Sequence, residues 1–211
     1  MQEGRSLRVF NGLGGAYSAE ISRAHPKEAE LRIGDFDDRN PESPLSIELG
    51  IALSKGDRFD YALQKATELG VSQIQPLQTD RVDGRFNAVR LAKKMLSWQA
   101  IVVSACEQSG RNKVPLIMPV KSIEDWCLEL SASTRIVLDP MSAGTRLNTL
   151  DKPADLSAAL LIGPEGGLTE TEIQHATEQG FQAMGMGPRI LRTETAPLSA
   201  ISIMQSLWGD I

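Results

Sequence analysis

Two loops near the end of the chain carry the residues best suited to chemistry. The first is Gly163-Pro-Glu-Gly-Gly167, whose glycines let a ligand approach the main chain closely. Glu165 places a carboxylate inside this loop, and the Gly-Lys-Ser/Thr ending of a Walker A phosphate loop is missing. The composition therefore favours a neutral or cationic ligand over a polyphosphate. The alternative is a tight turn with a solvent-facing Glu165.

The second loop, Gly187–Ala196, combines charged, hydroxyl and apolar side chains in one short stretch. Its residues include Arg189, Ile190, Leu191, Arg192, Thr193, Glu194 and Thr195. A guanidinium can stabilise a developing negative charge, and a carboxylate can accept a proton. Apolar side chains in a polar loop usually enter the core or form the wall of a pocket. The alternative is a loop that plugs the core, with Thr193 or Thr195 as N-cap of the last helix.

Strand and helix patterns that alternate from residue 45 onward are expected to position both loops. We expect strands over 47–53, 71–77, 135–138, 158–162 and 181–186. We expect helices after Asp57, over 88–108, after Ser122, after Thr169 and over the last residues. This alternation predicts an α/β fold, a parallel sheet with helices on both faces. Ligands of such sheets lie beyond the carboxyl ends of the strands, where both loops begin.

The first 44 residues show a different pattern. Residues 7–10, 15–21 and 29–33 read as short strands between turn formers, and a charged stretch with two prolines follows them. Three short strands leave open edges and little core, which indicates part of a small β-barrel. We therefore expect a partial barrel over 1–36, a linker over 37–44 and an α/β domain over 45–211.

Composition excludes several classes of protein. Of the 211 residues 41% are apolar and 23% charged, as in ordinary globular proteins. No apolar run approaches the roughly 20 residues that cross a bilayer, and no apolar signal segment follows Met1. The chain has two cysteines and two histidines, all far apart in sequence, so neither a disulfide scaffold nor a metal site is predicted. A cytoplasmic location is expected.

Basic residues concentrate in the middle of an acidic chain. The formal net charge is -5, but residues 55–113 carry 10 basic and 6 acidic side chains. A local basic face can bind phosphates on an acidic protein. The basic residues that we single out there are Arg81, Arg85, Arg90, Lys93, Lys94, Arg111 and Lys113. The alternative, strongest for Arg90, Lys93 and Lys94, is a solvated helix face.

The two loops together resemble a known family. The stretches 161–169 and 186–196 resemble the SPOUT class of RNA methyltransferases, in particular the RsmE type that methylates N3 of a uridine in 16S rRNA. Gln64–Val71, Ala105–Pro115 and Leu138-Asp-Pro140 resemble that type as well. The resemblance extends over residues 45–211, with a partial match over 1–34.

The resemblance implies a C-terminal trefoil knot whose loops bind S-adenosylmethionine (SAM). It also implies a homodimer and an N-terminal PUA-like barrel that docks RNA. The family's barrel normally starts some tens of residues before the point that matches Met1, so we expect a shortened barrel and an effect on RNA binding. The SAM-binding residues that it implies are Leu138, Pro140, Ile162, Gly163, Glu165, Gly166, Gly167, Met186, Gly187, Ile190, Leu191, Arg192, Thr195 and Ala196.

Roles in a reaction on 16S rRNA of the small ribosomal subunit follow from the chemistry of uracil. Arg192 would stabilise negative charge on the O2–N3–O4 edge, and Glu165 or Glu194 would be the base if poorly solvated. Glu165 could instead only pair with the positive end of the cofactor. No metal is required. The RNA contacts expected are Arg81, Arg85, Arg111 and Lys113. Two alternatives stay open: an RNA-binding or ribosome-assembly factor with a degenerate pocket, and a SPOUT tRNA 2′-O-ribose methyltransferase.

Overall fold

Alternating strands and helices from Ser46 onward build the larger of two compact units. The computed structural model describes residues 2–54, 56–82, 87–142 and 146–211. The smaller unit comprises Met1–Glu42 and Cys106–Val114, and the larger comprises Ser43–Ala105 and Pro115–Ile211. The sequence did not predict that Cys106–Val114 belongs to the smaller unit. The predicted domain division, with a linker over 37–44, stays a prediction.

The smaller unit contains an antiparallel sheet of strands β1 (Ser6–Val9), β2 (Ala16–His25) and β3 (Glu28–Asp37), in that order. Gly15 must be glycine because its φ is +67° and a Cβ there would lie 2.2 Å from the Phe36 ring. All residues of β3 are exposed, whereas Ala16, Ala19 and Ile21 of β2 are buried. The three predicted strands thus form, and each begins within about two residues of its expected start. Closure into a PUA-like barrel stays a prediction.

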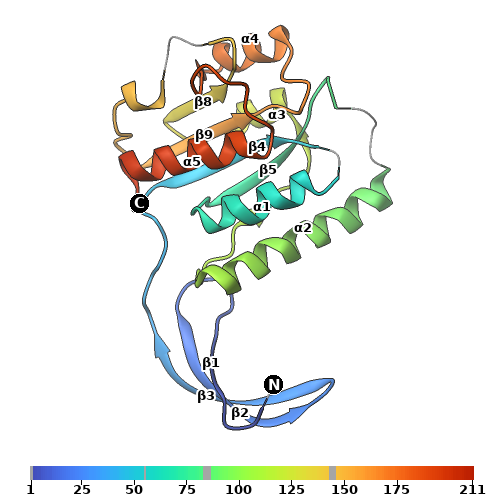
Figure 1. Cartoon of the computed structure of the whole chain (residues 1–211), viewed down its shortest axis with the longest axis vertical. Coiled ribbons are helices and arrows are strands. Elements are labelled where there is room, and N and C mark those ends of the chain that lie inside the picture. The colour runs from blue at the N-terminus through green and yellow to red at the C-terminus, as the bar shows by residue number, and fades with distance from the viewer. Residues whose placement is uncertain (1, 55, 83–86, 143–145) are drawn as a thin grey trace. The chain divides into compact units, whose positions relative to one another are not determined.

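The larger unit is built on a seven-stranded sheet with the order β10-β8-β9-β4-β5-β6, in which β7 also pairs with β5. Figure 1 labels its central strands β8, β9, β4 and β5. The strands are β4 (Ser46–Ala52), β5 (Gln73–Gln78), β6 (Leu116–Ile117), β7 (Lys121–Ser122), β8 (Thr134–Leu138), β9 (Ser157–Ile162) and β10 (Gln182–Met184). Every pairing within this sheet is parallel over the described residues. The predicted α/β fold with a parallel sheet is confirmed.

Helices cover both faces of this sheet. They are α1 (Arg58–Glu68), α2 (Ala88–Ser109), α3 (Ile123–Glu129), α4 (Glu170–Glu178) and α5 (Thr195–Trp208), with a 3-10 turn η1 (Leu147–Thr149). Helices α1 and α5 contact each other in front of the sheet in Figure 1, and α3 and α4 contact each other behind it. The α3 and α4 side forms a core with Leu77, Val137, Ala159 and Leu161. Intervening residues such as Leu160 point to the other face because strand side chains alternate.

Local signals in the sequence account for most element ends. Thr169 and Glu172 form the predicted capping box of α4, and Gly110 ends α2 with a φ of +80°. The last predicted strand, 181–186, is shorter than expected because the chain leaves the sheet after Met184. The N-cap alternative for Thr193 and Thr195 is wrong. Glu194 occupies the N-cap position of α5, and Thr195 is the first helical residue.

Candidate active site

The first loop, Gly163–Gly167, which we name the glycine loop, follows the carboxyl end of β9 and has a shape that requires its glycines. Gly167 has a φ of +71° and donates its N–H to the Pro164 carbonyl at 2.8 Å. A Cβ on Gly163 would lie 3.0 Å from the backbone nitrogen of Leu168. The loop is therefore held in a turn that a larger residue at position 163 would open.

A buried hydroxyl joins the second loop to the glycine loop. Thr193 Oγ1 donates to the Gly163 carbonyl oxygen over 2.7 Å, and the side chain of Thr193 is only 6% exposed. The two loops are 30 residues apart in sequence at this contact. Thr193 thus serves as a connection between the loops rather than as a helix cap.

The two loops enclose one cavity of about 630 Å³. That volume is typical of sites that bind a small molecule or cofactor. Apolar side chains from three strand ends form much of its wall. Its lining residues include Leu138, Asp139, Pro140, Met141, Ile162, Gly163, Glu165, Gly166, Gly167, Ile173, Met184, Met186, Arg189, Ile190, Leu191, Arg192 and Ala196.

Most residues that the resemblance implied for SAM binding lie around this cavity, which we name the first cavity. The residues from that set that do not line it are Gly187 and Thr195. Gly187 adopts a φ of +93° at the start of the second loop, and Thr195 donates its backbone N–H to the Arg192 carbonyl. Both therefore shape the loop instead of contacting the cavity.

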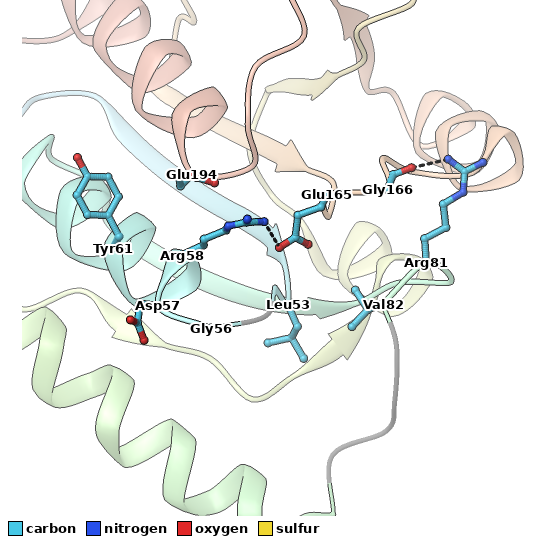
Figure 2. Close-up of a pocket in the computed structure, with 10 residues that line it drawn as sticks. All are labelled: Leu53, Gly56, Asp57, Arg58, Tyr61, Arg81, Val82, Glu165, Gly166 and Glu194. Atoms are coloured by element: carbon cyan, nitrogen blue, oxygen red, sulfur yellow. Dashed lines mark hydrogen bonds and ion pairs between the residues drawn. The ribbon is translucent and has the colours of Figure 1, made fainter.

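A second cavity of about 990 Å³, whose lining residues are drawn in Figure 2, shares part of its wall with the first. Four residues line both cavities, namely Arg58, Arg81, Glu165 and Gly166. The remaining lining residues are Leu53, Gly56, Asp57, Tyr61, Val82 and Glu194. Arg58 and Tyr61 were not among the site residues predicted from the sequence. They follow the carboxyl end of β4, so the rule that ligands bind beyond strand ends could have found them.

Two ion pairs lie where the cavities meet. Arg58 Nη1 and Glu165 Oε1 are 3.1 Å apart, with side chains 49% and 37% exposed. Arg192 Nη1 lies 4.0 Å from Glu194 Oε1, and the Arg192 side chain is 79% exposed. Glu194 Oε2 is buried, and no described donor reaches it. The three predicted catalytic residues, Arg192, Glu165 and Glu194, are therefore gathered at one place.

Arg81, predicted to contact RNA phosphates, binds carbonyl groups of the glycine loop in this structure. Its Nη1 donates to the Gly166 carbonyl at 2.7 Å and to the Leu168 carbonyl at 3.2 Å (Figure 2). Next to it, the backbone N–H of Asp80 donates to Glu172 at the start of α4. Arg81 thus holds the glycine loop from the segment after β5, which makes a structural role the better assignment.

The other predicted RNA contacts fall in different surroundings. Arg111 is 7% exposed and its guanidinium is bound to Glu42 inside the smaller unit, so a structural role is the simpler assignment and an RNA contact stays a prediction. Burial of such a pair requires both partners, which explains the charge of Arg111 without RNA. Lys113 is exposed, and its contact with RNA stays a prediction. Arg85 lies outside the described residues.

The two cysteines are buried, as expected for small apolar groups. Burial raises the pKa of Cys127 to about 11, so its thiol stays protonated near neutral pH. Within residues 2–54, 56–82, 87–142 and 146–211 there is no cluster of metal-ligating side chains. No described helix has the length and apolar character needed to span a membrane.

The raised pKa of Cys127 predicts a pH-dependent loss of stability. The folded state holds the thiol proton more tightly than the unfolded chain, in which the thiol has its ordinary pKa of 9.0. The free energy of unfolding should be unaffected by this group below pH 9 and should fall as the pH rises toward 11, by about 1 kcal/mol at pH 10. Urea denaturation of the parent and of Cys127→Ala at pH 7 and pH 10 measures the difference. An equal pH dependence in both proteins would contradict the prediction.

Comparison with known proteins places these loops and cavities in a family. The model of the RNA methyltransferase domain matches residues 41–205. The chain is 36% identical to ribosomal RNA small subunit methyltransferase E of Buchnera aphidicola subsp. Schizaphis graminum, across 100% of this chain and 85% of that protein. The enzyme of the same name from Bacillus subtilis is 32% identical, across 96% and 82%.

Solved structures agree with this match. Ribosomal RNA small subunit methyltransferase E of Neisseria gonorrhoeae bound to SAM has a TM-score of 0.93 and 42% identity, covering 100% of this chain and 86% of that one. A Legionella pneumophila methyltransferase solved with bound SAM has a TM-score of 0.95 and 37% identity over the same shares. The chain therefore belongs to the RNA methyltransferase domain family and, within it, to the ribosomal RNA small subunit methyltransferase E (RsmE) family.

Proposed function

We propose that this protein transfers a methyl group from SAM to N3 of a uridine in 16S rRNA of the small ribosomal subunit. The observation that carries the proposal is the single cavity between the glycine loop and the Gly187–Ala196 loop, which Thr193 joins through the Gly163 carbonyl. Family membership and the SAM-bound relatives from Neisseria and Legionella support it.

The first cavity suits a sulfonium nucleoside in size and chemistry. Leu138, Ile162, Met186 and Leu191 offer an apolar wall for an adenine ring, and the glycine loop leaves backbone groups within reach of it. Glu165 adds a carboxylate next to a cationic ligand. We propose that the residues implied by the resemblance hold SAM here, with Gly187 and Thr195 acting through the shape of the loop. When bound, SAM supplies an electrophilic methyl group.

The chain's own residues prepare the uracil for transfer. The imide N3 carries a proton at neutral pH, so a base must remove it before or during methylation. Glu165 lines both cavities and Glu194 lines the second, and one of these two carboxylates accepts the proton in our proposal. Arg192, which is close to Glu194, donates to the uracil oxygens on which negative charge develops. We propose no metal in this reaction.

Larger-scale features of the family remain proposals for this chain. We propose that residues 45–211 form the methyltransferase domain with a trefoil knot, and the contact between η1 and α5 supports a C-terminal helix close to the 139–156 segment. We also propose a homodimer, and a PUA-like RNA-docking role for residues 1–36 joined through a linker over 37–44. The small subunit as substrate implies a cytoplasmic place of action.

Methylation of intact small subunits and of naked 16S rRNA tests the function. The expected product is 3-methyluridine at one position, identified by mass mapping of the modified nucleoside. A 2′-O-methylated nucleoside in tRNA would favour the ribose methyltransferase. No SAM binding in calorimetry, with RNA binding retained, would favour the assembly factor. Comparison with an N-terminally extended chain measures how far residues before the first described strand contribute to RNA binding.

The bonds of Arg81 give a separate prediction. Arg81→Ala should weaken SAM binding about tenfold, because a charged donor to two carbonyls of the glycine loop is lost. Calorimetry with SAM measures the change. Arg90→Ala is the matched control, since Arg90 is an exposed arginine of α2 that lines neither cavity. Unchanged SAM affinity together with weaker RNA binding would restore the assignment of Arg81 as an RNA contact.

A further inference from the structure

The second cavity has features that SAM binding leaves unused. It shares Arg58 and Glu165 with the first cavity, so an occupant of each would meet there. The larger unit alone supplies all of its lining residues. Because methyl transfer requires donor and acceptor to be in contact, this neighbouring cavity is where a second substrate would lie.

Part of the second cavity is apolar and suits a flat ring. Leu53 follows β4 and is 2% exposed, and Val82 lies half-buried after β5. The side chains of both residues are drawn along the lower edge of the cavity in Figure 2, below Arg58 and Glu165. A nucleobase turned out of an RNA stack needs such apolar contacts on its face. The volume of about 990 Å³ also leaves room for the attached sugar.

The polar part presents a donor beside an acceptor. Arg58 Nη1 and Glu165 Oε1 lie 3.1 Å apart, and Glu194 adds a second carboxylate above Arg58 in Figure 2. The imide edge of uracil has an N3–H donor flanked by two carbonyl acceptors, so a carboxylate next to a guanidinium complements it. Cytosine has an acceptor at N3 and a donor at N4, so a donor–acceptor pair alone can bind either base. Discrimination requires the carboxylate of Glu165 to lie opposite N3, where uracil carries a proton and cytosine carries none.

We propose that the second cavity receives the target uracil and that Arg58 leaves its ion pair with Glu165 to donate to a carbonyl oxygen of the base. This inference rests on the proposed function. Exchange of partners is easy here because both side chains of the pair are more than one third exposed, and exposed ion pairs contribute little to stability. The exchange also frees Glu165 to accept a hydrogen bond from N3–H.

Steady-state methylation of small subunits by Arg58→Ala tests the assignment. We expect kcat/KM to fall about 10- to 100-fold, because a hydrogen bond from a charged donor to the substrate is lost. Because Arg58 also lines the first cavity, SAM affinity is measured separately by calorimetry and should change only a few-fold, well below the effect on kcat/KM. Arg58→Lys should recover only part of the activity, since lysine lacks the planar fork of arginine. Lys65→Ala is the matched control, because Lys65 lies on the same helix in an ion pair with Glu68 and lines neither cavity.

Thionated substrates separate contact with the base from an effect through Glu165. Small subunits reconstituted with 4-thiouridine or 2-thiouridine at the target replace one carbonyl acceptor by a weaker one. The ratio of rates on thio and oxo substrates, taken for the parent and for Arg58→Ala, cancels the intrinsic effect of sulfur on N3. With the parent, we expect the rate on one of the two thio substrates to be about tenfold lower than the rate on the oxo substrate. With Arg58→Ala, we expect the rates on the thio and oxo substrates to be equal apart from that intrinsic effect.

Each other outcome overturns the assignment. Parental kcat/KM in Arg58→Ala would show that Arg58 does not contact the substrate. Loss of SAM binding in that variant, or equal thio effects in both proteins, would show that it acts only through Glu165 and the glycine loop. A parent protein that binds no SAM or makes no 3-methyluridine would remove the proposed function itself, and with it this inference. The parent measurement distinguishes that failure from a failure of Arg58 alone.

Discussion

Replacement of Arg192 by alanine should lower the rate of methyl transfer about 100- to 1,000-fold, the range found when one preorganised donor to a developing oxyanion is removed. The side chain is 79% exposed, and its ion pair with Glu194 has a 4.0 Å separation. It therefore contributes little to folding, and SAM affinity should change only a few-fold. Single-turnover methylation with saturating SAM measures the chemical step directly.

The Arg192 experiment needs a control for loss of surface charge. Arg146→Ala serves, because Arg146 is an exposed arginine of the same unit that lines neither cavity. Arg192→Lys should restore part of the rate, since it keeps the charge but not the fork. Parental single-turnover rates in Arg192→Ala would exclude Arg192 from the reaction and leave charge stabilisation to Arg58.

Substitution of Gly50 by valine should destabilise the larger unit by about 3 kcal/mol, a large share of the stability of a typical domain. Gly50 lies in β4, and a Cβ there would be 2.3 Å from the Trp126 ring. The ring is 1% exposed and its Nε1 donates to Glu48, so it has no free space to move into. A displaced ring would also lose that hydrogen bond. Urea denaturation monitored by tryptophan fluorescence measures the change.

A second substitution separates steric overlap from the intrinsic preferences of valine. Trp126→Leu alone leaves a cavity and should also destabilise the protein. If overlap causes the Gly50→Val effect, the double variant should be more stable than the sum of the single losses predicts, by at least about 1 kcal/mol. Strict additivity would mean that the Trp126 ring is not what limits the size of residue 50.

Elements with strong local signals were predictable from the sequence. The apolar face of α2 and Gly110 predicted a helix over 88–108, and it runs over Ala88–Ser109. The Thr169 and Glu172 capping box predicted the start of α4. The assignment of Cys106–Val114 to the smaller unit was not predictable, because its partners are far away in sequence: Leu13 forms a β-bridge with Lys113, and Glu42 pairs with Arg111.

The candidate site was predictable where composition is unusual and was missed where composition is ordinary. The glycines around Glu165 and the mixed loop around Arg192 stood out in the sequence. The bond from Thr193 to Gly163 did not, because a threonine before a helix also suggests a cap. Arg58 was missed because a charged residue in the first turn of an exposed helix is common. The bonds of Arg81 to the glycine loop were not predicted either, because its charge does not reveal whether a phosphate or a carbonyl is its partner.

The position of β4 within the sheet affects how the chain folds during translation. β4 lies between β5 and β9, so its two neighbours come from residues 73–78 and 157–162. During synthesis the β5 edge can pair early, whereas the other edge of this apolar strand waits until more than 100 further residues have been added. Long-range parallel pairing of this kind is slow and leaves nascent chains prone to aggregate. Chaperone dependence during translation, ending once residues beyond 162 emerge, is the expected result.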